Sequence, residues 1–140
     1  MLTIASISLS DAKRIINAAE AKAMQIGSPG NVAVAVAVVD AGGNRVAHVP
    51  MDGAQPASIS HSINKAFTSL ACKTATLDLA ADAQPGASLY GIAHSVDGRI
   101  ITFAGCMPLE SGDSFVGAVG GSGSTADQNQ AVAEAPVAAL

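Results

Sequence analysis

Lys65 is the residue of this sequence whose surroundings point most directly to a binding role. It lies between Ile63 and Phe67, in a stretch where apolar residues recur at helical spacing. An isolated ammonium group is costly to bury, so the head group must reach the rim of the protein or find an anionic partner. The alternatives are a structural lysine whose stem follows apolar surface and a lysine that neutralises the carboxylate of a ligand or substrate. Lys65 is our first candidate for binding an anion.

A second candidate group is the run Met51-Asp52-Gly53-Ala54, which directly follows a predicted strand. Asp52 would place a carboxylate at the end of the sheet, where it could exchange a proton with a substrate held by Lys65. Met51 could contact a ligand through its sulfur, although methionine more often fills gaps in apolar cores. We expect both residues beside Lys65 at the rim of one site.

The three histidines, His48, His61 and His94, fall in three different predicted elements. They form no HxH or HExxH spacing, so the sequence does not indicate a zinc site. His61 lies four residues before Lys65 and therefore on a similar helix face. It is the candidate base and the candidate ligand for haem iron, and the alternative for each of the three is a structural histidine.

A glycine-rich segment, Gly120-Gly121-Ser122-Gly123, lies where a predicted strand passes into a helix. Unpaired backbone N–H groups at such a place could hold a carboxylate or a phosphate. The segment matches neither GxSxG, GxGxxG nor a phosphate-binding loop. The alternative is a tight turn followed by a helix cap, with Thr125 and Gln128 forming a capping box.

The spacing of apolar residues predicts the elements that would position these groups. A helix begins at Ser10-Asp11 and ends at the breakers of residues 27–30. Residues 32–39 alternate valine with alanine, which predicts a strand covered on both faces, with space on the alanine side for a helix or a neighbouring subunit. Residues 40–43 are typical of a turn into a second, antiparallel strand over residues 44–49.

The second half of the chain predicts a long helix followed by further strands. The helix begins at Pro56 and continues towards Leu77. Asp97-Gly98 predicts a hairpin between residues 92–96 and 99–104, residues 115–119 predict another strand, and a closing helix begins near Ser124. This order indicates one α+β domain spanning residues 1–140, with about five antiparallel strands and helices on the faces.

The amino-acid composition argues against several classes of function, nucleic-acid binding and a membrane role among them. Only 13% of the 140 residues are charged, about half the usual share, so we expect self-association. A net charge of −4 and 3% aromatic residues argue against nucleic-acid binding. No apolar run approaches the roughly 20 residues that cross a bilayer, and no export signal opens the chain, so we expect no membrane role and a cytoplasmic location. Cys72 and Cys106 have no metal-site spacing and are expected to be reduced thiols.

Four motifs in order resemble the GlcG-like family, which includes haem-binding HbpS and the C-terminal domain of the PduO adenosyltransferase. They are the strand followed by Asp-Ala-Gly-Gly (residues 34–43), Met-Asp-Gly-Ala (51–54), Lys-Ala-Phe-Thr (65–68) and Val-Gly-Ala-Val-Gly-Gly-Ser-Gly (116–123). The resemblance implies a profilin-like α/β/α layout with a five-stranded antiparallel sheet and homo-oligomers of up to an octamer. For some members it also implies binding of haem or a related tetrapyrrole.

This chain departs from the family pattern at three positions. Pro50 stands where the family usually has arginine, Cys106 replaces a glycine, and Asn129 stands where aspartate is common. Loss of the arginine removes a bidentate partner for a carboxylate or propionate. Lys65, Asp52 and the Ser122-Gly123 turn remain in register.

These observations predict a small homo-oligomeric protein that binds a small-molecule ligand, either haem, another anionic tetrapyrrole or a small carboxylate. The pocket is expected between residues 51–54, Lys65 and residues 120–124. A rival hypothesis is a cofactor-free enzyme acting on a small organic acid, in which Lys65 neutralises the carboxylate, Asp52 or His61 exchanges a proton, and the amides of residues 121–123 stabilise an oxyanion. A third is a domain that only assembles.

Overall fold

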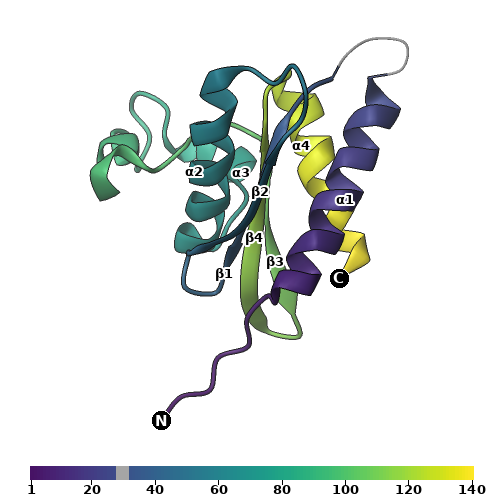
Figure 1. The fold of residues 1–140 in the computed structure, drawn as a ribbon. Helices are drawn as coiled ribbons and strands as arrows, with labels where there is room; N and C mark the ends of the chain where they lie inside the picture. The colour runs from purple at the N-terminus through teal and green to yellow at the C-terminus, as the bar shows by residue number, and fades with distance from the viewer. Residues whose placement is uncertain (28–31) are drawn as a thin grey trace.

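The computed structural model describes residues 1–27 and 32–140. Its helices and strands, in chain order, are α1 (Leu9–Ile26), β1 (Ala35–Asp40), β2 (Arg45–Pro50), α2 (Pro56–Cys72), α3 (Thr76–Asp82), the short 3₁₀ turns η1 (Ile92–His94) and η2 (Val96–Gly98), β3 (Cys106–Ser111), β4 (Ser114–Ser122), α4 (Ala126–Glu134) and η3 (Ala135–Ala139). The strands form one antiparallel sheet in the order β2-β1-β4-β3. Figure 1 shows the three layers: α2 covers one face, and α1 and α4 cover the other.

The first helix begins two residues earlier than the spacing predicted. Ser8 is its N-cap, and Ser8 and Asp11 form a reciprocal capping box that satisfies amide groups at the open end of the helix. The helix continues to Ile26, with Gly27 at its end. The other predicted breakers, residues 28–30, lie outside the described residues.

The alternation of valine and alanine in β1 decides how closely each layer approaches the sheet. Val36 and Val38 face the core that contains α1, whereas Ala37 packs with Ala66 of α2 on the other face. Both faces of β1 are fully buried, as the sequence predicted. The small side chains let α2 lie against the sheet, so a helix occupies the space left on the alanine side.

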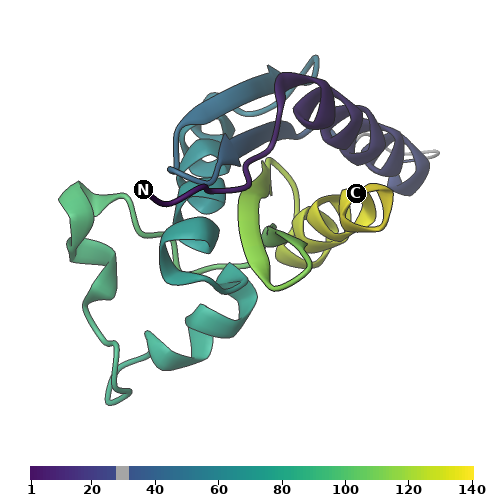
Figure 2. The ribbon, with the colours of Figure 1, turned by 90° about the horizontal axis from the view of Figure 1, so that it is seen from below.

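The predicted hairpin around Asp97-Gly98 is wrong. Residues 92–98 form η1 and η2, and Val96 and Asp97 have positive φ angles of 51° and 55°. The first part of the connection between α3 and β3, residues 84–98, is largely exposed and extends away from the body of the protein, as Figure 2 shows. These residues fold back on themselves as short turns instead of pairing with a strand, so the sheet has four strands rather than five.

The long helix also ends earlier than predicted. α2 stops at Cys72, because Lys73 takes a left-handed conformation with φ of 52°, and Leu77 belongs to the separate helix α3. Within the described residues, no helix is both long enough and apolar enough to cross a bilayer.

Candidate functional site

Lys65 is fully buried between α2 and the sheet. Its Nζ donates hydrogen bonds to the Gly121 carbonyl oxygen at 3.0 Å and to the Ser122 hydroxyl at 3.3 Å. No carboxylate pairs with this ammonium among the residues that the structure describes. The ammonium thus does not reach the rim as one alternative predicted, and inside the protein two neutral oxygens solvate it.

Burial changes the acidity of this group. Loss of hydration lowers the pKa of Lys65 to about 8, and the nearby Cys106 sulfur opposes the shift. The amine thus remains mostly charged at neutral pH, without an opposite charge beside it. Such a group attracts an anion strongly once one can approach, because the surroundings screen it less than water does.

An aromatic ring that the sequence analysis missed lies over the ammonium. Nζ of Lys65 is 4.8 Å from the centroid of Phe103, and the ring of His61 meets the same phenyl ring edge to face, with centroids 5.6 Å apart. Phe103 is 45% exposed and His61 is half-buried, so this cluster reaches the surface. Phe103 was missed because residues 99–104 were interpreted as a strand, and only its aromatic character could have indicated a role.

The glycine-rich segment approaches Lys65 through its carbonyl rather than through free amides. Gly120, Gly121 and Ser122 belong to β4, and the Gly121 N–H donates to the Gly105 carbonyl oxygen at 2.7 Å. The expected free amide at Gly121 is therefore not available. The capping alternative is confirmed farther along, where Thr125 and Gln128 form the reciprocal cap of α4.

Gly105 makes room for the ammonium. A Cβ atom there would lie 2.5 Å from the Gly121 carbonyl oxygen and 2.7 Å from Nζ of Lys65, and its φ of +131° also favours glycine. Its backbone is held on both sides, because its N–H donates to Gln130 Oε1 at 3.0 Å and its carbonyl accepts from Gly121. The lysine site thus depends on the absence of a side chain at this position.

Met51 and Asp52 are not brought to the lysine. Met51 packs against the core on the α1 side of the sheet, opposite to α2. Asp52 is exposed in the turn after β2, and no hydrogen bond or ion pair of the described residues connects it to Lys65. The structure therefore joins Lys65 with Gly121, Ser122, Phe103 and His61, and leaves the second predicted group outside.

Of the remaining candidate donors, the histidines His48 and His94 are not among the groups found near the Lys65 ammonium, whereas Cys106 lies near it. His48 Nε2 is 3.2 Å from the Ser62 hydroxyl, and burial together with the charge of Arg45 lowers the pKa of this histidine. His94 is exposed in the connection of residues 83–105. Cys106 is buried against Thr76, and burial raises the pKa of its thiol. In the described ranges, no three metal-binding side chains gather at one point.

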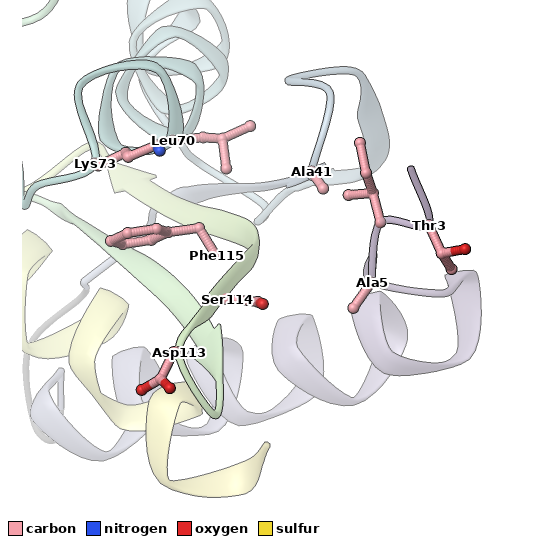
Figure 3. Close-up of a pocket in the computed structure, with 9 residues that line it drawn as sticks. Thr3, Ala5, Ala41, Leu70, Lys73, Asp113, Ser114 and Phe115 are labelled. Atoms are coloured by element: carbon pink, nitrogen blue, oxygen red, sulfur yellow. The ribbon is translucent and has the colours of Figure 1, made fainter. Parts of the chain in front are cut away.

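A separate pocket lies at the end of the sheet where both hairpins turn. Figure 3 shows it between the N-terminal segment and the end of α2, with Leu70, Lys73 and Phe115 on one side and Thr3 and Ala41 on the other. Its volume is about 390 Å³. None of the residues predicted to bind a ligand lines it, so it does not serve the lysine cluster.

Comparison with known proteins places these features in a family context. The family model described as haem-degrading protein HbpS-like matches residues 7–138. An uncharacterized 15.0 kDa protein from the dhaT-dhaS intergenic region of Citrobacter freundii is 41% identical over 131 residues, which cover 94% of this chain and 89% of that protein.

Two further relatives carry a name that points to tetrapyrrole chemistry. The corrinoid adenosyltransferase PduO of Salmonella typhimurium is 33% identical, and the match covers 99% of this chain but only 40% of the enzyme. A solved structure described as a PduOC:heme complex has a TM-score of 0.90 at 33% identity, covering 96% of this chain and 95% of that one. The similarity thus extends over nearly all of this chain and over a part of the longer enzyme.

Proposed function

The chain belongs to the HbpS-like family, and on that premise we propose that it is a small homo-oligomeric protein that binds haem on the surface formed by His61, Phe103 and Lys65. The observation that carries this proposal is the buried ammonium of Lys65, which has two neutral acceptors and no carboxylate among the residues described. Burying a charge without an opposite charge is costly. A ligand that brings its own carboxylate would supply the missing partner.

The residues present fit the chemical parts of haem. A propionate needs a cation, which Lys65 provides. The flat ring system needs an apolar surface, for which Phe103 offers a half-exposed aromatic face. Bound haem would supply an iron that takes a nitrogen ligand, and His61 is the histidine in contact with this cluster. The methionine predicted as a ligand contact, Met51, packs on the other face of the sheet.

Hemin titration tests this proposal. We expect a saturable shift of the Soret band with the purified protein, and loss of the histidine-coordinated spectrum in His61→Ala. His94→Ala is the matched control, since it removes an exposed histidine outside the cluster and should leave the spectrum unchanged. Lys65→Met, which keeps an unbranched side chain, should weaken hemin binding by about tenfold or more, since it removes a charge-assisted hydrogen bond.

Other outcomes would favour the rival hypotheses. Absence of a saturable Soret shift would contradict haem binding. If hydroxocobalamin binds instead, the site takes another tetrapyrrole. If only small carboxylates raise the melting temperature, and Lys65→Met removes that rise, the acid-binding or enzyme hypothesis is favoured. In that hypothesis the proton would be exchanged by His61, because no ion pair of the described residues joins Asp52 to the lysine. The Gly121 amide would not stabilise an oxyanion, because it already donates to Gly105.

A further inference from the structure

The ring of Phe103 is an exposed neighbour of the buried Lys65 ammonium. Among the described residues, groups found near Nζ are the Gly121 carbonyl, the Ser122 hydroxyl, the backbone of Gly105, the Cys106 sulfur and the ring of Phe103. The first four belong to buried residues, whereas Phe103 is 45% exposed. A ligand that approaches the ammonium from the side of this exposed residue must therefore pass the place that the ring occupies.

The hydrogen bonds of the ammonium also indicate the side of Phe103 as the place for a ligand. A lysine head group has three donor protons. Gly121 and Ser122 accept two of them, and the ring of Phe103 is the remaining partner near Nζ. A carboxylate is a stronger partner for a cation than the face of a phenyl ring, because it carries a full negative charge and accepts a hydrogen bond. Exchange of the ring for a carboxylate would complete the third hydrogen bond.

The segment that carries the ring is held at its two ends. On one side the Ile101 N–H donates to Thr68 Oγ1 at 2.9 Å. On the other side Gly105 is bonded to Gln130 and Gly121. Between these points, no hydrogen bond of the described residues holds residues 102–104, which lie in neither a helix nor a strand. The ring can thus turn away while the backbone on either side stays in place.

We propose that Phe103 is the gate of the Lys65 site: its ring covers the ammonium in the free protein and turns aside to admit the carboxylate of a flat ligand, whose face then lies against the phenyl ring. This inference deepens the proposed function, because it assigns the entry route and the ligand class of that same site. The rings of His61 and Phe103 are in contact, so a ligand that binds the imidazole also frees the phenyl ring to turn. Rotation of a half-exposed ring is fast compared with ligand exchange.

The test measures how readily each lysine reacts with an amine reagent. Trace acetylation near the Lys65 pKa of about 8, followed by mass spectrometry, compares Lys65 with Lys13, Lys22 and Lys73 in the same sample. In the unmodified protein we expect Lys65 to react slowest. Phe103→Ala should raise its rate by roughly tenfold and leave the other lysines unchanged. Phe103→Leu, which keeps an apolar cover, should raise it less.

A second aromatic residue provides a matched control for unfolding. Phe115 also lies below a lysine ammonium, with Nζ of Lys73 at 5.8 Å from its ring centroid. Phe115→Ala should not change the labelling of Lys65. If it accelerates Lys65 labelling as much as Phe103→Ala does, the reagent reaches the lysine through general loosening of the fold, and the gate is overturned. An unchanged Lys65 rate in Phe103→Ala overturns it as well.

Adding hemin separates this inference from the proposed function. If both hold, hemin protects Lys65 from acetylation in the Phe103→Ala variant. If Phe103→Ala exposes Lys65 but hemin gives neither protection nor a Soret shift, the gate stands and haem is the wrong ligand. If hemin gives the Soret shift but the labelling of Lys65 is indifferent to residue 103, haem binding stands and the gate is wrong.

Discussion

At the scale of single residues, Lys65 provides the charge of the site, and its burial lowers the free energy of unfolding. The group is fully buried and its pKa falls from 10.5 to about 8, chiefly because it loses hydration. The folded state therefore binds this proton less tightly than the unfolded chain does. Above about pH 10.5 the lysine is neutral in both states, and its deprotonation stabilises the folded state fully. This stabilisation is lost as the pH falls through about 8, where the folded protein takes up the proton.

This shift predicts a pH-dependent difference between the protein and Lys65→Met. The free energy of unfolding of the unmodified protein, minus that of the variant, should rise by about 3 kcal/mol between neutral pH and the pKa of free lysine. Urea unfolding at a series of pH values measures it. The Cys106 thiol lies nearby, and burial raises its pKa, which changes the free energy of unfolding with pH in the opposite direction. Repeating the series in a Cys106→Ser background removes this contribution, and a flat difference there would contradict the assigned pKa.

At the scale of elements, the approach of α2 to β4 brings the lysine to its acceptors. Gly120 lies directly under the helix, where a Cβ atom would overlap the Ser62 carbonyl oxygen and lie 2.6 Å from the Ala66 amide. Both neighbours are backbone of α2, so neither can turn aside. The absence of a side chain at this position of β4 therefore sets the distance between helix and sheet.

Two adjacent glycines of β4 allow a direct test of this packing. Gly120→Ala should lower the free energy of unfolding by about 3 kcal/mol, because the helix must move away from the sheet. Gly121→Ala should change it by less than about 1 kcal/mol, because the nearest atom to its new Cβ would be Cγ1 of Val132 at 3.4 Å. Urea unfolding of the two variants checks the difference. Equal effects would mean that the layer separation is not set at Gly120.

At the scale of the whole molecule, the surface of a single chain is poor in charge and carries many exposed apolar side chains. Only 13% of the residues are charged. The large apolar residues that are at least 39% exposed are Met1, Leu2, Ile4, Leu9, Met24, Ile59, Leu77, Leu89, Tyr90, Val96, Phe103 and Leu140. A surface with so few charges is poorly protected against association.

We therefore expect the protein in solution to contain more than one chain. Light scattering coupled to size-exclusion chromatography should give a mass that is a multiple of 13.8 kDa and stays constant on moderate dilution. The family resemblance sets the expected upper size at eight chains. A mass equal to one chain at micromolar concentration would contradict this prediction, and it would leave the hemin experiments unaffected.

The sequence by itself determined the local elements and the inner faces of the layers. The valine and alanine of β1 alternate with the two-residue period of a strand, so the sequence alone assigns them to opposite faces. The cap of α4 followed from Thr125 and Gln128, which lie three residues apart. Lys65 and His61 were identified as neighbours because they are four residues apart on one helix. Each of these inferences uses residues close together in the chain.

Only the tertiary structure decided what lies around Lys65. The lysine and its acceptor at Gly121 are 56 residues apart. The pattern around Asp97-Gly98 satisfies the local rule for a hairpin, yet residues 92–98 form short turns, and the segment that follows brings Phe103 over the ammonium. Contacts between segments far apart in the chain are a property of the assembled fold, and local spacing does not encode them.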